Sequence, residues 1–382
     1  MKKSFVTIFP ETENFHLVKD VGQIPYFMGK SGEYDSTIVS YKNSPEYPYL
    51  EKEVKGLKIS FIPRSGKFLY SDVSILKYLF SESINIDVLN LFHFKKDNLL
   101  YLLLYKILNP KGKTYVKLDI DLNFFKNYNS FFFSDFKLKN HLLKSLTKLH
   151  LNLTDLFSIE TEEARGYLIK IYPELEGKLI CVPNGVDDEL INSSISLKTF
   201  EEKENIIITV GRIGTAQKNS ELLLESIKLT DLRDWKVYFI GDVEESFKNT
   251  ISNFFETYPH LKDQVFFTGN ISDRKQLFEF YNRAKIFCLT SRFEGFPIAF
   301  AEASYFGNYI ISTPVSGSSY VTDSGRLGIL AEAKPEAIAG AFGKAVSEGY
   351  LNRDVDQEIK VYARLNLTWQ KIIPRITNYF NP

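Results

Sequence analysis

Cysteine is scarce in this sequence. Only Cys181 and Cys288 occur among 382 residues, and each stands within an apolar run, LICVP and IFCLT. Two isolated cysteines exclude the dense disulfide framework of small secreted domains. Their apolar neighbours instead predict buried thiols in a reducing compartment.

Long hydrophobic runs and an excess of one charge are also absent. No stretch reaches the ~18 uninterrupted apolar residues that a membrane-spanning helix requires, and the N-terminal MKKSFVTIFPETEN is interrupted too early to hold the core of a signal peptide. The 47 basic residues balance the 47 acidic ones, which argues against binding nucleic acid through overall basicity. We therefore expect a cytoplasmic protein, either free or peripheral at the inner face of a membrane.

Short apolar runs recur along the chain, with helix-like stretches between them. Most are rich in β-branched and aromatic residues and end in Gly, Pro, Asp, Asn or Ser, which is typical of buried parallel strands. Two such series predict two doubly wound α/β sheets. The expected strands are 4–10, 36–41, 57–63, 87–93, 114–120, 156–161 and 178–183, followed by 205–212, 235–242, 264–269, 285–291, 309–315 and 327–332.

The length of the chain predicts two domains, because 382 residues exceed the size at which a single hydrophobic core stops growing. The polar, poorly periodic stretch 184–205 is the expected joint, which gives domains of 1–184 and 185–364. Ligands of open parallel sheets bind beyond the carboxyl ends of the strands. With two facing sheets, the cleft between them is the expected site.

The segment VGRIGTAQKN at 210–219 follows an expected strand and precedes a helical stretch. Gly211 allows a ligand to approach the backbone, and Arg212 and Lys218 place two cations where the dipole of the following helix also favours an anion. A diphosphate fits such a place, although two solvated loop charges would give the same pattern. The sequence has no GxxxxGK[ST] motif, which excludes a Walker phosphate loop.

The stretch SRFEGFPIAFAEASYFG at 291–307 holds two carboxylates eight positions apart, Glu294 and Glu302. Pro297 is expected in the first turn of a helix. This places Glu294 just before the N-terminus of that helix and Glu302 about 1.5 turns inside it. Carboxylates accept hydrogen bonds from sugar hydroxyls but repel phosphate. The alternative is an ion pair for Glu302 and a surface position for Glu294. The helix start also offers backbone amides to phosphate or sugar oxygens, from Gly295, Phe296 and Ile298.

These motifs occur together in one known family. In order and spacing they resemble the retaining nucleotide-sugar glycosyltransferases of family four, which have the GT-B fold of two Rossmann-like domains facing across a cleft. The resemblance covers the second half of the chain and extends weakly through the first. Its strongest element is the pair of glutamates with the upstream Arg and Lys. The motifs are VPNGVD (182–187), VGRIGTAQKN, FIGD (239–242), FFTGN (266–270), LTSRFEGFPIAFAEA (289–303) and STPVSG (312–317).

The resemblance implies donor-binding roles in the second half of the chain. Arg212 and Lys218 would neutralise the diphosphate leaving group. Glu302 would bind the ribose hydroxyls, and the loop near Asn270 would meet the base through backbone groups. Members of this family need no metal or other cofactor. The donor sugar and its phosphates would contact Glu294, Gly295, Phe296, Pro297 and Ile298, next to Gly211.

The first half of the chain carries a weaker resemblance. Gly22, in KDVGQIPYFMGK at 19–30, resembles a first-loop glycine that lets the backbone approach the diphosphate. Many relatives have a His in the catalytic cleft where VKLDID places Asp119, so Asp119 either replaces that His or binds acceptor hydroxyls. His93, which ends LNLFHF, is the other candidate for contacting the donor sugar, against a purely structural role.

The segment Asp119 to Asp121, DID, has a second interpretation. It would suit the Asp-x-Asp motif with which GT-A glycosyltransferases ligate a divalent cation, and it follows an apolar run as that motif should. That hypothesis leaves the Arg, the Lys and the paired glutamates of the second half unexplained. The favoured site therefore contains no metal.

Two further segments bear on partners and topology. Residues 124–150 hold five lysines, one aspartate and six phenylalanines, which would suit contact with an anionic membrane and a lipid-linked acceptor. The alternative is an amphipathic helix that covers the first sheet. The run LNLTWQKIIPRITNYF resembles the closing helix of the family, so residues of about 365–382 are expected to cross back onto the first domain.

The expected enzyme transfers a hexosyl unit from a nucleoside diphosphate sugar, UDP-sugar above all, to the hydroxyl of a glycan, lipid-linked or protein acceptor. Assembly of cell-surface polysaccharide or glycoconjugate is the expected setting. Retention of anomeric configuration would follow from front-face chemistry, with Arg212, Lys218, Glu294 and Asp119 as catalytic candidates and no protein nucleophile. The alternatives are a sugar-nucleotide epimerase of the same fold and a non-catalytic partner subunit.

Overall fold

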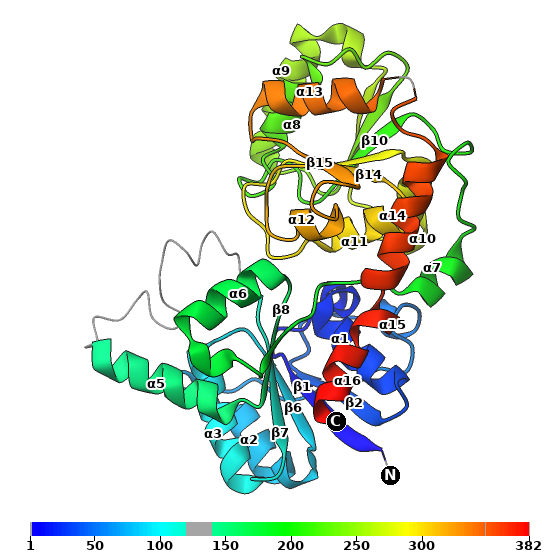
Figure 1. The fold of residues 1–382 in the computed structure, drawn as a ribbon. Coiled ribbons are helices and arrows are strands. Elements are labelled where there is room, and N and C mark those ends of the chain that lie inside the picture. The colour runs from blue at the N-terminus through cyan, green and yellow to red at the C-terminus, as the bar shows by residue number, and fades with distance from the viewer. Residues whose placement is uncertain (1, 120–139, 348, 382) are drawn as a thin grey trace. The chain divides into compact units, whose positions relative to one another are not determined.

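The computed structural model of the chain describes residues 2–119, 140–347 and 349–381. The chain divides into two compact units, each built on one parallel sheet (Figure 1). Unit 1 comprises Met1–Asn184 and Ile372–Pro382, and unit 2 comprises Gly185–Lys371. The two doubly wound α/β sheets predicted from the sequence are confirmed, because each expected strand segment overlaps one strand of these sheets.

The sheet of unit 1 has seven parallel strands in the order β3-β2-β1-β6-β7-β8-β9. The chain winds outward from β1 to β3, returns beside β1 as β6, and continues to β9. The carboxyl ends of all these strands lie along one edge of the sheet, where doubly wound folds bind ligands. The strands are β1 (Lys3–Ile8), β2 (Tyr34–Ser40), β3 (Lys58–Phe61), β6 (Val88–Phe92), β7 (Lys113–Lys117), β8 (Leu156–Ile159) and β9 (Leu179–Cys181).

Side-chain caps fix where two helices of unit 1 begin. Asp72 accepts a hydrogen bond from the amide of Ser74 (3.0 Å), and Thr161 accepts one from the amide of Ala164 (3.2 Å). Such caps satisfy first-turn amides that have no partner within the helix. The helices are α1 (Asp20–Lys30), α2 (Val73–Glu82), α3 (Lys96–Leu108), α5 (Asn140–Leu153), α6 (Glu162–Ile171) and α16 (Pro374–Phe380), and a hairpin of β4 (Lys67–Phe68) and β5 (Ser71–Asp72) precedes α2.

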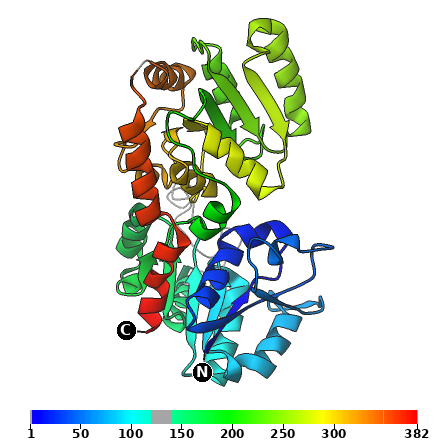
Figure 2. The same cartoon turned by 90° about the vertical axis from the view of Figure 1, so that its right-hand side faces the viewer.

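The sheet of unit 2 has six parallel strands in the order β12-β11-β10-β13-β14-β15, with helices on both of its faces (Figure 2). Its first strand, β10, again lies in the middle, so the switch in winding direction falls between β10 and β13. Loops that follow these two strands are therefore neighbours. The strands are β10 (Ile206–Val210), β11 (Lys236–Ile240), β12 (Val265–Gly269), β13 (Ile286–Leu289), β14 (Tyr309–Ser312) and β15 (Gly328–Leu330).

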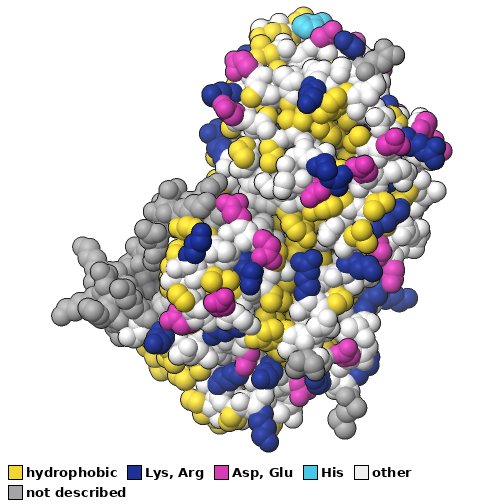
Figure 3. All heavy atoms as spheres, viewed as in Figure 1, with side chains coloured by type: hydrophobic (Ala, Val, Ile, Leu, Met, Phe, Trp, Pro, Cys, Tyr) yellow, Lys and Arg dark blue, Asp and Glu magenta, His cyan; other side chains and the backbone are white. Residues whose placement is uncertain are grey.

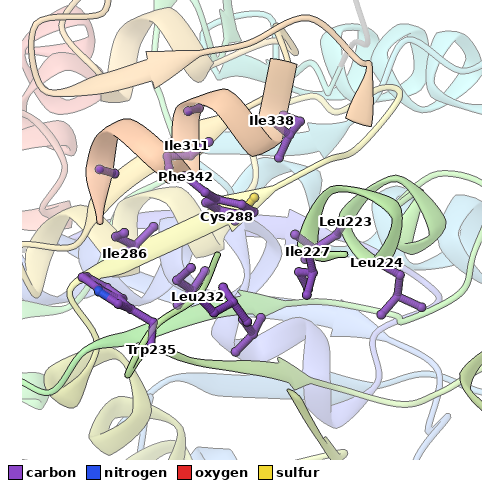
Figure 4. Close-up of a cluster of buried hydrophobic side chains, with 14 of the residues drawn as sticks. Leu223, Leu224, Ile227, Leu232, Trp235, Ile286, Cys288, Ile311, Ile338 and Phe342 are labelled. Atoms are coloured by element: carbon purple, nitrogen blue, oxygen red, sulfur yellow. The ribbon is translucent and has the colours of Figure 1, made fainter. Parts of the chain in front are cut away.

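A hydrophobic core of aliphatic and aromatic side chains fills one face of the unit 2 sheet (Figure 4). Cys288 of β13 is fully buried there beside Ile311 and Phe342. Cys181 of unit 1 is also buried, which raises the pKa of its thiol to about 12. Both are free cysteines, so the prediction of buried thiols is confirmed. The helices of unit 2 are α7 (Asp188–Ser194), α8 (Ser220–Ile227), α9 (Lys248–Thr257), α10 (Arg274–Arg283), α11 (Ile298–Tyr305), α12 (Ser318–Val321), α13 (Pro335–Ala345), α14 (Arg353–Asn366) and α15 (Trp369–Ile372).

A buried ion cluster fastens α14 to the rest of unit 2. The carboxylate of Asp356 lies 2.8 Å from Nζ of Lys203 and 2.7 Å from Nζ of Lys360. Lys203 also donates to the carbonyl of Phe306 (2.6 Å), and Lys360 to that of Lys198 (2.8 Å). Burial lowers the pKa of Lys203 to about 8, against the opposing effect of Asp356. One carboxylate thus pairs with two ammonium groups in the protein interior.

The chain returns to unit 1 through two short helices rather than one. Pro374 has no amide hydrogen with which to continue α15, so α16 starts there as a separate helix. Arg375 donates to the carbonyl of Cys181 (3.0 Å), and the hydroxyl of Tyr379 to that of Asp155 (2.7 Å). The single closing helix expected from about residue 365 is therefore wrong in detail, and the part that belongs to unit 1 begins at Ile372.

Candidate functional site

Two loops of unit 2 meet where neighbouring strands end. The segment 211–219 follows β10, and the segment 290–297 follows β13, the strand beside it. The amide of Arg292 donates to the carbonyl of Gln217 (2.8 Å), and its Nε donates to that of Ala216 (3.0 Å). These two segments, called the loop platform below, are thus hydrogen-bonded to each other at the carboxyl edge of the sheet.

Glu294, the acidic residue of the loop platform, accepts three side-chain hydrogen bonds. Its Oε1 accepts from Nζ of Lys218 (2.6 Å) and from the hydroxyl of Ser291 (2.6 Å), while Oε2 accepts from Nε2 of Gln217 (3.2 Å). The Glu294 residue is only 7% exposed. The sequence alternative of a solvated surface carboxylate is therefore wrong, because this carboxylate is buried and paired with a cation.

Gln217 links the second cation of the loop platform to this carboxylate. The exposed Arg212 donates through its Nη2 to Oε1 of Gln217 (2.7 Å), whose Nε2 donates to Glu294 and also to the carbonyl of Phe293 (3.2 Å). The structure thus brings Arg212, Lys218 and Glu294 together, as the family resemblance implied. Sequence reasoning missed Gln217 and Ser291, although one precedes Lys218 and the other lies two residues after β13.

Two glycines make room for the lysine. A Cβ atom on Gly211 would lie 2.9 Å from Cε of Lys218, and a Cβ atom on Gly241 would lie 1.8 Å from the carbonyl oxygen of Gly211. Gly241 therefore lets the backbone of Gly211 approach β11, and Gly211 lets the side chain of Lys218 cross to Glu294. The space that we expected Gly211 to leave for a ligand is occupied by this side chain.

The start of α11 differs by one residue from the expectation. Pro297 is the cap residue, with an extended backbone (φ −60°, ψ 125°), and Ile298 is the first residue of the helix. Gly295 and Phe296 lie in the preceding loop, and the ring of Phe296 is buried against Gly317. First-turn amides have no partner within an α-helix. The donor-binding role of these four positions stays a prediction.

Glu302 lies inside α11 and is 3% exposed. Its Oε1 accepts a hydrogen bond from Nη2 of Arg274, whose guanidinium lies 4.6 Å from the ring centre of Phe278. Burial and the negative charge of Glu302 both raise the pKa of Tyr281, the neighbouring phenol. The sequence alternative that gave Glu302 an ion-pair partner is confirmed, and its contact with ribose stays a prediction.

The loop after β12 supplies Arg274. Asn270, the predicted base-contacting residue, is exposed directly after β12. Three residues later Asp273 caps α10 by accepting from the amides of Lys275 (2.8 Å) and Gln276 (3.1 Å), which sets Arg274 at the helix start. The sequence did offer a signal for Arg274, because it is a cation that follows a strand ending at the same edge as β13.

Gly22 of unit 1 lies within α1 rather than in a loop before a helix. Its amide donates to the carbonyl of Lys19 (3.0 Å), and a Cβ atom would lie 2.3 Å from the carbonyl oxygen of Leu17. Packing of α1 against the preceding turn therefore accounts for this glycine. The loop position expected for Gly22 is wrong, and its approach to a diphosphate stays a prediction.

Replacing Gly22 by Ala tests this packing. We expect the free energy of unfolding to fall by about 2 kcal/mol, because the added methyl meets backbone atoms that cannot rotate away. Gly166, in the middle of α6, has no heavy atom within 4 Å of its Cβ position. Gly166→Ala is the matched control and should raise stability by about 0.5–1 kcal/mol in urea unfolding. Equal stability of both variants would contradict the close contact.

A buried ion pair at the carboxyl edge of unit 1 was missed from the sequence. Lys117 ends β7 and is fully buried, bonded to Glu160 after β8 and 3.6 Å from Oδ2 of Asp20. A lysine in a strand core is rare unless paired, and its partner lies 43 residues away. Asp119, two positions on, is exposed. Burial and Lys95 lower the pKa of His93, while Asp119 opposes that shift.

Several sequence hypotheses fall on segments that the structure leaves out. Asp121 and most of the basic stretch 124–150 lie outside the described residues, which resume at Asn140 as α5. His150 and Leu151 of α5 are buried, so the last turn of this helix packs against the rest of unit 1. Across residues 2–119, 140–347 and 349–381, no helix could span a bilayer, and no three His, Cys, Asp or Glu side chains gather as metal ligands would.

The two Rossmann-like parallel sheets, one in each unit, define the GT-B fold, as expected. Residues 194–364, which lie within unit 2, match the sequence model of the family Glycosyl transferases group 1. This part of the chain is therefore similar to group 1 glycosyltransferases, and it contains the loop platform.

The chain is also similar to individual proteins. The amylovoran biosynthesis glycosyltransferase AmsD of Erwinia amylovora is 28% identical over 178 residues, 41% of this chain and 49% of AmsD, so the chain spans about half the length of this curated relative. Two solved structures share the fold. A glycosyltransferase from Rickettsia africae has a TM-score of 0.75 at 14% identity, covering 100% of this chain and 98% of the other. Anabaena HepE, in complex with UDP and glucose, has a TM-score of 0.71 at 12% identity, covering 99% of both chains.

Proposed function

We propose that this chain is a retaining glycosyltransferase of family four. It transfers a hexosyl unit from a nucleoside diphosphate sugar, with UDP as the nucleotide, to an acceptor hydroxyl during assembly of a polysaccharide or glycoconjugate. The observation that carries the proposal is the bonded set of Arg212, Gln217, Lys218 and Glu294 on the loop platform. The UDP and glucose complex of HepE supports the donor, and the amylovoran role of AmsD supports the setting.

The loop platform offers both charges that such a reaction requires. Lys218 and Arg212 would stabilise the negative charge that develops on the leaving diphosphate, and this electrostatic contribution is usually the largest in such sites. Glu294 would accept a hydrogen bond from a sugar hydroxyl, and in the unliganded protein it holds Lys218 in place. The leaving phosphate oxygen would help to remove the acceptor proton, so the chemistry requires neither a protein nucleophile nor a metal.

The decisive experiment first identifies the donor and then determines the anomeric configuration of the product. Thermal shifts with UDP, GDP and ADP and their sugars identify the donor, because a bound nucleotide raises apparent stability by mass action. NMR of the product then reports the anomeric configuration, which should be that of the donor. Isomerised nucleotide sugar without acceptor would support the epimerase, and a chain that binds and consumes no donor would be a non-catalytic subunit.

Glu302→Gln is expected to weaken UDP binding about tenfold or more, because a hydrogen bond from a ribose hydroxyl to a carboxylate contributes about 1.5–3 kcal/mol. Calorimetry with UDP and 2′-deoxy-UDP separates this role from the structural one. The natural protein should discriminate between the two nucleotides, and Glu302→Gln should not. The exposed Glu256→Gln serves as control. Arg274→Gln disrupts the same ion pair but should still discriminate between UDP and 2′-deoxy-UDP. If Arg274→Gln loses this discrimination as well, Glu302 does not contact ribose directly.

Peripheral contact with an anionic membrane through residues 124–150 also stays a proposal. So do the cytoplasmic location, the roles of Asp119 and His93, and the absence of a cofactor. Asp119 is exposed at the carboxyl edge of unit 1, which is compatible with contact to acceptor hydroxyls. Asp119→Asn should then change the KM for acceptor and leave the KM for donor unchanged.

A further inference from the structure

The hairpin between β4 and β5 has an unusual turn. Leu69 and Tyr70 are its two turn residues, and both have positive φ angles, 46° and 74°. Such turns favour Asn-Gly or Asp-Gly, because other residues are strained in the left-handed region. Their side chains are nevertheless 68% and 52% exposed, and that of Phe68 beside them is 57% exposed. Neither turn stability nor burial explains this choice of residues.

The hairpin tip, defined as Phe68, Leu69 and Tyr70, continues into an apolar groove. The groove lies between the hairpin, α2 and α3, has a volume of about 540 Å³, and is lined by Phe68, Phe80, Leu100 and Leu104 among others. Phe80 is 73% exposed at its rim. Over α2 and α3, at the lower left of unit 1 in Figure 3, hydrophobic side chains lie among Lys and Arg side chains.

Lysines accompany the apolar residues of this surface. Lys77 lines the groove, Lys67 is exposed at the base of the hairpin tip, and Nζ of Lys96 lies 5.6 Å from the ring centre of Tyr70. The nearest carboxylate of the hairpin, Asp72, accepts from Ser65 (3.0 Å) and from the amide of Ser74 (3.0 Å) as the cap of α2. Positive charge therefore accompanies the exposed apolar residues.

We propose that the hairpin tip and the groove bind the surface of a lipid bilayer that carries anionic headgroups. Leu69 and Tyr70 would enter the boundary between headgroups and acyl chains, where an aromatic ring with a polar end is favoured, and the lysines would meet lipid phosphates. A bilayer suits an open groove edged by long, exposed side chains, because it needs no matching rigid surface. This surface is built from other residues than 124–150 and the loop platform.

Vesicle sedimentation with the full chain tests the proposal. The vesicles are phosphatidylcholine with or without about 30% phosphatidylglycerol, to vary the anionic charge. The informative variant is Leu69→Asn with Tyr70→Gly, which installs the turn that the backbone favours. It should lower binding to the anionic vesicles about tenfold or more while leaving the melting temperature equal or higher. Lys67→Glu and Lys77→Glu should each lower binding to the anionic vesicles at least about fivefold.

Leu229→Asn is the matched control, because Leu229 is 51% exposed in unit 2 and should leave vesicle binding unchanged. The proposal is overturned if the natural protein does not sediment with anionic vesicles, or if the double hairpin variant binds them as tightly. It is also overturned if the natural protein forms a dimer in light scattering that the double variant dissolves without any vesicle binding, since a second copy would then be the occupant.

Discussion

Replacing Lys218 by Met is expected to reduce turnover by about 10²–10³-fold, because one preorganised charge that stabilises the leaving group is lost. Lys218 is 16% exposed and held 2.6 Å from Glu294, so it is already oriented before any ligand arrives. A group that acts mainly in the transition state should change kcat more than KM. Steady-state kinetics with the identified donor measure both quantities.

The same variant leaves the carboxylate of Glu294 buried without its cation, so a loss of stability has to be separated from a loss of chemistry. Glu294→Gln has nearly the same shape without the charge. We expect Lys218→Met to lower the melting temperature, and the double variant Lys218→Met, Glu294→Gln to recover most of that stability while turnover stays low. The exposed pair of Lys248 and Glu245 is the control, and Lys248→Met should change neither quantity.

If Lys218→Met keeps its turnover and raises only the KM for donor, Lys218 contributes ground-state binding alone. If the double variant regains turnover along with stability, the lysine is structural, and the proposed role in leaving-group stabilisation fails. Arg212→Ala provides an independent comparison, since Arg212 is exposed and its removal leaves no buried charge. We expect it to lower kcat more than donor affinity.

The second large effect concerns the ion cluster of unit 2. Asp356→Ala is expected to lower the free energy of unfolding by about 3–5 kcal/mol, because the ammonium groups of Lys203 and Lys360 would stay buried without their shared carboxylate. Urea unfolding at pH 7 measures the loss. The double variant Asp356→Leu, Lys203→Met removes one charge of each sign and should be more stable than Asp356→Ala. A variant Asp356→Ala that unfolds like the natural protein would contradict this account.

The pH dependence follows from the lowered pKa of Lys203, about 8 in the folded protein. Below that pH the lysine is charged in both states, and the cost of burying its charge is fully present. Between pH 8 and the ordinary pKa of a lysine, only the unfolded chain holds the proton, so stability rises with pH. Relative to Lys203→Met, the natural protein should gain up to about 3 kcal/mol over this range.

Much of this fold could be predicted because each strand has a recognisable local sequence pattern. Runs such as NIIITVGR and KIFCLTS carry the β-branched and aromatic residues of buried strands, and their order along the chain predicted two doubly wound sheets. The rule that ligands lie at carboxyl edges pointed to the loops after these strands, and the family resemblance implied that Arg212, Lys218 and Glu294 act together. The structure places them there, within one network.

The partners of these residues could not be predicted in the same way. Arg274 meets Glu302 across 28 residues, and Lys117 meets Glu160 across 43, so neither pairing leaves a periodic signal. Gly22 was misplaced because a glycine before a helix and a glycine packed inside its first turn look alike in sequence. Only the position of the Leu17 backbone distinguishes them.

The hydrogen bonds of the loop platform determine which of its positions tolerate substitution during evolution. Arg292 and Gln217 donate to the main-chain carbonyls of Ala216 and Phe293, whose own side chains point to solvent. Any residue that allows the same backbone supplies the same carbonyl. Positions 216 and 293 are thus free to vary among descendants of this chain while Lys218 and Glu294 keep their geometry. The loop platforms of two related chains can therefore keep the same site geometry although their amino acids differ at these positions.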